Sequence, residues 1–184
     1  MPLVDIAAAF ETIRSGGVVA CPTEAVYGLS CDPWNEAAVR SLLAMKERDA
    51  AQGLILVAGG AYQFTSLLRG LPRDRQEILA ASWPGPVTWL VPANEHVPPW
   101  IRGRHDKVAL RVTDHPAMAE LCRVAGKPLV SSSANRSGDA PARTPETVEE
   151  YFPGIPVLEG PLGGRERPSE IRDLLTGEIL RPGS

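Results

Sequence analysis

The stretch GLILVAGG at residues 53–60 decides the fold class of this 184-residue chain. Leu54 to Ala58 form a continuous apolar run that is bounded by glycines on both sides. A half-exposed strand would alternate apolar and polar residues, whereas a short unbroken run is typical of a strand buried inside a sheet. The stretch therefore predicts an interior strand.

Outward from this strand, short apolar runs alternate with helical patterns. Further strands are predicted at residues 18–21, 87–91, 108–112, 128–131 and 178–181. Helix starts are indicated by Asp5, by Asn35, by Pro116 and by Pro145, because capping side chains and early prolines suit the first helical turn. The pattern predicts one α/β domain over residues 1–184, built on a mixed sheet.

Composition excludes several classes of protein. The net charge is −3 and the chain has 43% hydrophobic residues, as in an ordinary globular protein. No apolar run approaches the roughly 18 residues of a membrane span. The first residues lack the basic start of a secretory signal, and the three cysteines have no CxxC spacing, so we expect reduced thiols in a cytoplasmic protein with no membrane contact.

Familiar catalytic motifs are missing from the sequence. There is no GxxxxGK[ST] loop, no GxGxxG after a strand, no HExxH and no paired CxxC, so a dedicated metal site is not expected. We expect surface or structural roles for His96, His105 and His115. A triad of Ser131, His115 and Asp114 can be drawn, but no GxSxG turn supports it.

Four polar segments follow or flank the predicted strands. They are residues 22–29, residues 46–48, residues 131–138 and residues 163–173. In open α/β sheets ligands bind where such loops converge at strand ends. Lys46 and Arg48 could neutralise a polyphosphate, although a lysine and an arginine at a helix end are also a common solvated surface, and a serine-rich turn need not bind anything.

Taken together and in order, these segments resemble the YrdC family, in particular its short bacterial threonylcarbamoyl-AMP synthases. The matching blocks are CPTEAVYGLSCDP, KERDAAQGLILVA, WPGPVTWLVPA, LRVTDHP, KPLVSSSANRSG and the closing GGRERPSEIRDLLTGEILRPG. They run from about residue 17 to residue 183, which is nearly the whole chain. Six blocks in family order are far more specific than any one of them.

The resemblance implies a twisted open α/β sheet with flanking helices and a concave basic cavity. It also implies that L-threonine, bicarbonate and ATP, with Mg²⁺ accompanying the nucleotide, are converted to threonylcarbamoyl-AMP and pyrophosphate. The product would supply the proteins that transfer the threonylcarbamoyl group to adenosine 37 of tRNA, and direct contact with tRNA is possible.

Site residues carried over from the family match particular positions of this chain. For ATP they are Lys46, Arg48, Arg111, Ser133, Asn135, Arg143 and Arg181. Thr23 and Ser169 match positions near threonine, and the resemblance identifies no general base. Two departures stand out, since Asp49 replaces the usual proline after the lysine and arginine pair, and Val57 stands where longer relatives often have a histidine.

Two other functions are compatible with parts of the sequence. A module that binds RNA on the same basic surface would need no chemistry, although the chain is acidic overall and lacks an aromatic and basic platform. A small hydrolase could use the serine cluster. The ordered blocks favour the synthase.

Overall fold

The computed structural model describes residues 1–183 and has a mixed α/β architecture. The helices are α1 (Ile6–Arg14), α2 (Glu36–Met45), α3 (Arg73–Ser82), α4 (Pro99–Arg102), α5 (Pro116–Ala125) and α6 (Pro145–Tyr151), with short 3₁₀ turns η1 (Ala50–Gln52) and η2 (Ala61–Phe64). The strands are β1 (Leu3–Val4), β2 (Val19–Pro22), β3 (Tyr27–Ser30), β4 (Ile55–Ala58), β5 (Val87–Pro92), β6 (Lys107–Val112), β7 (Leu129–Ser133), β8 (Val157–Leu158), β9 (Glu170–Asp173) and β10 (Ile179–Arg181).

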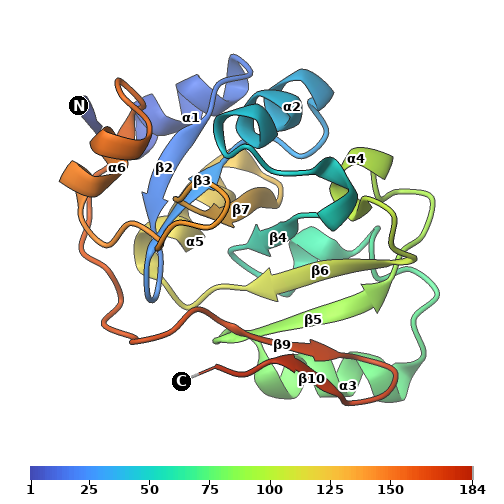
Figure 1. Cartoon of the computed structure of the whole chain (residues 1–184). Helices are drawn as coiled ribbons and strands as arrows, with labels where there is room; N and C mark the ends of the chain where they lie inside the picture. The colour runs from blue at the N-terminus through green and yellow to red at the C-terminus, as the bar shows by residue number, and fades with distance from the viewer. Residues whose placement is uncertain (184) are drawn as a thin grey trace.

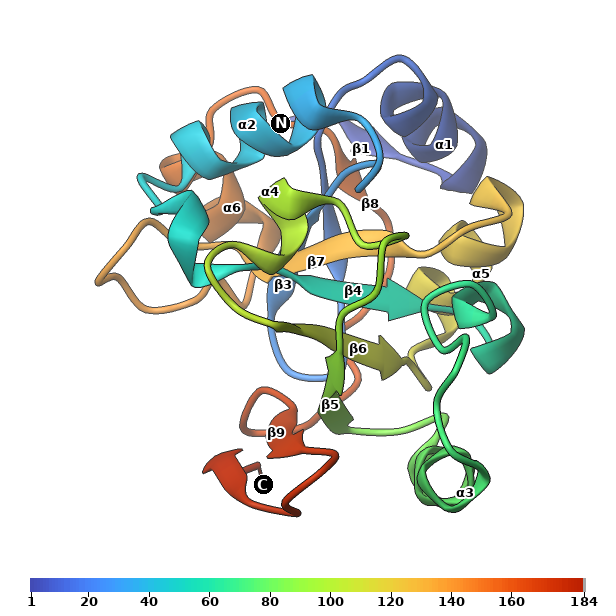
Figure 2. The same ribbon diagram turned by 90° about the vertical axis from the view of Figure 1, so that its right-hand side faces the viewer.

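All ten strands form one open sheet in the order β1-β8-β2-β3-β7-β4-β6-β5-β9-β10. The sheet is mixed, because β4 and β6 are parallel while β4 and β7 are antiparallel. It twists strongly, so that β5 is turned across the direction of β4 in Figure 2. The two chain ends lie at opposite edges of the sheet, the N-terminus beside β1 and the C-terminus beyond β10 (Figure 1).

Strand β4 is buried on both faces, as its unbroken apolar run predicts. Leu56 and Ala58 belong to the larger apolar cluster, which also contains the inward faces of α2 and α3. Val57 points to the opposite face and packs in a second cluster with residues of α1 and α5. The interior position of this strand is therefore confirmed.

Helix starts follow the predicted capping signals. Asp5 accepts from the backbone N–H of Ala8 at 2.8 Å, and Asn35 accepts from that of Ala38 at 3.2 Å. Helices α5 and α6 begin at Pro116 and Pro145, where a missing N–H costs no hydrogen bond. These four helices are predicted correctly to within a few residues.

Several elements carry no clear signal in the sequence. Strand β3 runs through the segment interpreted as a polar loop, and β7 extends past residue 131, so that Ser131 and Ser132 are buried strand residues. Gly28 lets β3 approach β7 closely, since a Cβ there would come within 3.2 Å of the Ser131 hydroxyl. Strands β1, β8 and β9 and helices α3 and α4 are also absent from the sequence prediction.

None of the helices within residues 1–183 is long and apolar enough to cross a membrane.

Candidate active site

A cavity of about 630 Å³ opens along the sheet where the β2–β3 turn, β6, β9 and β10 meet. Its wall carries six Lys or Arg side chains and three carboxylates. The cations are Arg48, Arg102, Lys107, Arg111, Arg165 and Arg181, and the carboxylates are Glu24, Asp106 and Asp173. The excess of cations suits an anionic ligand.

A recess of about 40 Å³ adjoins this cavity and is lined by Lys46, Arg48, Ser133, Asn135 and Ser137. Arg48 and Ser133 line both spaces, so the recess and the cavity are neighbours. The predicted residues Thr23, Arg111, Ser169 and Arg181 line the larger space. Residues scattered over the chain thus come together in one place.

Arg143 is the exception among the predicted residues. Its side chain is exposed, donates a hydrogen bond to the backbone carbonyl of Glu166, and lines neither space. An ATP contact by Arg143 therefore stays a prediction without support from its position.

Lys46 is buried at the C-terminal end of α2, where its ammonium group stabilises the turn that follows β7. The Nζ atom donates to the backbone carbonyls of Ser133 and Asn135, the latter at 2.7 Å. Burial, together with the positive charge of Arg48, lowers the pKa of Lys46 to about 8. The lysine is both a structural tie and a charge that can be lost near physiological pH.

Ser133 and Asn135 also hold this turn with their own side chains. The Ser133 hydroxyl donates to Asn135 Oδ1 at 2.6 Å, and Asn135 Nδ2 donates to the carbonyls of Arg136 and Asp139 at 2.9 and 3.0 Å. The Asn135 side chain is thus used in shaping the turn. Contact of either residue with a nucleotide remains a prediction.

Arg48 has one buried donor without a partner among the described residues. Its Nη2 atom donates to the Gly53 carbonyl at 3.0 Å, whereas its buried Nε–H has no partner among the described residues. Burial lowers the pKa of Arg48 from its ordinary high value. A buried, unpaired guanidinium donor is costly unless a ligand completes it, so Arg48 is a strong candidate for binding an anion.

Asp49, which stands in place of the usual family proline, does not line the site. Its carboxylate accepts from the backbone N–H of Ala51 at 2.9 Å and caps the 3₁₀ turn η1. The Asp49 carboxylate therefore interacts with the backbone N–H of the 3₁₀ turn.

Arg111 is held by a buried ion pair with Glu24. Arg111 Nη1 lies 2.5 Å from Glu24 Oε1, which also accepts from the Thr113 hydroxyl at 2.6 Å. Burial alone would raise the pKa of the Glu24 carboxyl, but the charge and hydrogen bond of Arg111, aided by Thr113, lower that pKa to about 2. The Nε–H of Arg111 is buried without a partner among the described residues, as in Arg48.

Glu24 is the main site residue that sequence reasoning missed. It stands beside Thr23 in the PTE block, and that block is the only signal that pointed to it. The Thr23 hydroxyl donates to the Val26 carbonyl at 2.6 Å. Residues of the closing segment rest on this turn, since Gly163 N and Arg165 N donate to the carbonyls of Thr23 and Glu24 at 3.0 and 2.9 Å.

A triad of Ser131, His115 and Asp114 does not form, in agreement with the missing GxSxG turn. His115 caps α5 through Nδ1, and its Nε2 lies 2.9 Å from the Pro161 carbonyl oxygen. Asp114 pairs instead with Arg165 at 3.0 Å. Both ring nitrogens of the histidine are thus used away from Ser131, and the predicted structural role of His115 is confirmed.

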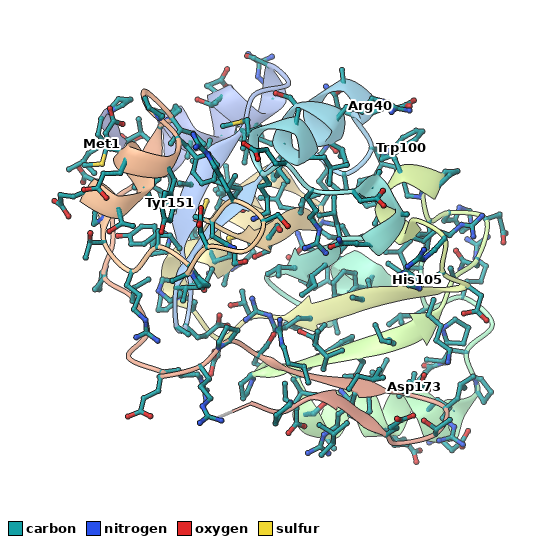
Figure 3. All side chains as sticks on the ribbon, in the orientation of Figure 1. Met1, Arg40, Trp100, His105, Tyr151 and Asp173 are labelled. Atoms are coloured by element: carbon teal, nitrogen blue, oxygen red, sulfur yellow. The ribbon has the colours of Figure 1, made fainter. Side chains whose placement is uncertain are left out.

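His105 lies at the rim of the cavity, on the same side of the molecule as Asp173 (Figure 3).

The fold and the site define an α/β protein with a cavity in which Lys and Arg side chains outnumber carboxylates. Residues 11–183 match the Sua5/YciO/YrdC family, whose description is "Telomere recombination", and the chain belongs to this family. It is 54% identical over 176 residues to the threonylcarbamoyl-AMP synthase of Pseudomonas aeruginosa (strain UCBPP-PA14), with 95% of both chains covered. It is 55% identical over 174 residues to the enzyme of the same name from Stutzerimonas stutzeri (strain A1501), with 94% of both covered.

Solved structures agree with this family. P. abyssi Sua5 complexed with L-threonine superposes with a TM-score of 0.89 at 33% identity, covering 97% of this chain but only 54% of that one. The chain therefore spans about half the length of Sua5. HypF in its phosphate- and nucleotide-bound form is 16% identical with a TM-score of 0.78, which shows a shared fold alone.

The ion pair leads to a prediction about stability and pH. Glu24→Gln should lower the free energy of unfolding by about 3–5 kcal/mol at neutral pH, because it leaves Arg111 buried without a counter-charge. The folded pKa of Glu24 is depressed, so the stability that it contributes is present above pH 4.5 and is lost as pH falls toward 2. Urea unfolding at pH 6 and pH 3 should show the difference between the two proteins shrinking in acid.

Glu77→Gln is a matched control, since Glu77 pairs with Arg73 on the exposed face of α3. Its effect should stay below about 1 kcal/mol at both pH values. A constant difference between unmodified protein and Glu24→Gln at the two pH values would contradict the assignment.

Proposed function

We infer that this protein is a threonylcarbamoyl-AMP synthase, which converts L-threonine, bicarbonate and ATP into threonylcarbamoyl-AMP and pyrophosphate. The single strongest support is the identity of 54% over nearly the full length of relatives with that name. The cavity supports it independently, since its cationic wall gathers the matching residues Thr23, Arg48, Arg111, Ser169 and Arg181. Its volume is that of a site for small molecules.

The chemistry that we propose needs alignment and charge more than a protein nucleophile. The threonine amine combines with bicarbonate to give a carbamate and water. A carbamate oxygen then bonds to the α-phosphorus of ATP as the bond from that phosphorus to the β-phosphate oxygen breaks, and pyrophosphate leaves. Catalysis of such a displacement rests on orienting the reactants and neutralising the phosphates.

Arg48 and Arg111 are suited to this task because both guanidinium side chains line the same cavity and each keeps a buried Nε–H that has no partner among the described residues. Their positions are set before any substrate arrives, Arg48 by the Gly53 carbonyl and Arg111 by Glu24. Donors that are already oriented need no reorganisation when charge develops on the phosphates. Lys46 adds a positive charge in the adjoining recess.

Magnesium is proposed to arrive with the nucleotide. Within residues 1–183 no three His, Cys, Asp or Glu side chains gather as a metal site, and Glu24 is already used by Arg111. Mg²⁺ commonly binds through substrate phosphates and keeps several waters. We therefore assign no protein residue to hold it and no step to it.

We further propose that the product passes to cytoplasmic proteins that transfer the threonylcarbamoyl group to adenosine 37 of tRNA. The product is a mixed anhydride of a carbamate and a phosphate, so a group-transfer reaction must consume it. Binding of RNA as the main role is less well supported, because the matching cations Arg48, Arg111 and Arg181 line a cavity sized for small molecules.

Purified protein should release pyrophosphate only when ATP, threonine and bicarbonate are all present.

Arg48→Ala should lower kcat/KM for ATP by about 100-fold or more, the usual effect of removing one donor to developing charge. Arg73→Ala is the control, since Arg73 is 92% exposed on α3. Near-normal turnover in folded Arg48→Ala protein would count against the assigned role, and release without threonine would count against the function.

The lowered pKa of Lys46 leads to a pH profile. In the free protein the ammonium group loses its proton near pH 8, so kcat/KM for ATP should fall as pH rises above about 8. Lys46→Arg keeps its charge over this range and should lack this decline, even if its overall rate is lower. Titration of threonine and bicarbonate affects the pH profiles of the unmodified protein and of Lys46→Arg equally. An identical decline of kcat/KM above about pH 8 in both proteins would therefore assign the titration to a group other than Lys46.

A further inference from the structure

Thr88 lies directly beneath the cavity without lining it. It is a β5 residue with 0% exposure, and its Oγ1 lies 2.8 Å from the Oγ of Ser169, which does line the cavity. Strand β9 pairs in parallel with β5 just beyond Ser169, with Thr88 opposite Ile171. The two hydroxyls are therefore held together by the sheet.

Arg181 makes a second contact with the same hydroxyl. Its Nη2 atom lies 3.3 Å from Ser169 Oγ and 2.6 Å from the Ser169 carbonyl oxygen, and its Nε donates to that carbonyl at 3.0 Å. A guanidinium group only donates, so Ser169 Oγ accepts from Arg181. One lone pair and the hydroxyl hydrogen of Ser169 remain.

The position of the remaining hydrogens follows from the burial of Thr88. Its hydroxyl has no hydrogen-bond partner other than Ser169 among the described residues. If Ser169 donated to Thr88, the Thr88 hydrogen would be buried without an acceptor, which is unfavourable. If Thr88 donates instead, its own buried hydroxyl is satisfied and the Ser169 hydrogen is free to point into the cavity.

We propose that Thr88 is a positioning residue that makes Ser169 a hydrogen-bond donor toward an acceptor oxygen of the bound amino acid. This rests on the proposed function, in which threonine enters with a carboxylate and becomes a carbamate. Both groups offer only acceptor oxygens, and a hydroxyl whose two lone pairs are used can only donate. Thr88 thereby makes the Ser169 hydroxyl a donor that suits a negatively charged substrate, although Thr88 itself does not contact the substrate.

Two substitutions of Thr88 test the proposal. Thr88→Val keeps the shape of the side chain and removes the hydroxyl, whereas Thr88→Ser keeps the hydroxyl. We expect Thr88→Val to raise KM for threonine about tenfold, the effect of losing one good hydrogen bond, with KM for ATP unchanged. Thr88→Ser should stay within about twofold of the unmodified protein for both substrates.

A double-mutant cycle with Ser169→Ala separates positioning from a general loss of structure. Thr88 acts through Ser169 in this proposal, so Thr88→Val should have no further effect on KM for threonine once Ser169 is alanine. An equal penalty in both backgrounds would overturn the proposal, as would an equal rise in KM for ATP.

The outcomes for the unmodified protein distinguish this inference from the proposed function. Pyrophosphate release that requires all three substrates, combined with an unchanged KM for threonine in Thr88→Val, would overturn the role of Thr88 alone. Failure of the unmodified protein to release pyrophosphate would overturn the function and this inference together.

Discussion

The buried pair of Glu24 and Arg111 is the interaction on which the site depends. It joins the β2–β3 turn to β6 in the wall of the cavity, and the backbone of the closing segment is hydrogen-bonded to the same turn through Gly163 and Arg165. A lone arginine at this depth would be strongly destabilising, and a fully exposed one would be mobile and screened by solvent. The glutamate allows a permanent positive charge to be kept in the wall of a cavity.

Other polar side chains around the cavity also make hydrogen bonds within the protein, and these bonds hold the site in shape in the absence of a ligand. Lys46, Ser133 and Asn135 bind one another and the backbone of one turn. Among the cations of the cavity wall, the buried donors without a partner in residues 1–183 are the Nε–H groups of Arg48 and Arg111. A site of this kind is stiff, and it can stabilise developing charge because its dipoles are already oriented.

Local signals predicted much of the fold. Capping residues and prolines identify four helices, since a cap acts within three or four residues of the chain. The short strands β1, β3, β8 and β9 escaped prediction because two to four residues carry no useful alternation, and their conformation comes from neighbours distant in sequence. The motif residues of the site were largely identified by family resemblance, whereas Glu24 and Thr88 became visible only through their partners.

The sequence by itself determined that β4 is an interior strand, where helices α1, α2, α5 and α6 begin, and which residues could bind an anion. Those properties depend on side-chain type and on spacing over a few residues. Only the tertiary structure decided which of these residues meet, because Lys46 and Asn135 are separated by 89 positions in the chain and Glu24 and Thr113 by the same number. Contacts at such separations arise from how the sheet orders its strands, and local sequence patterns do not encode that order.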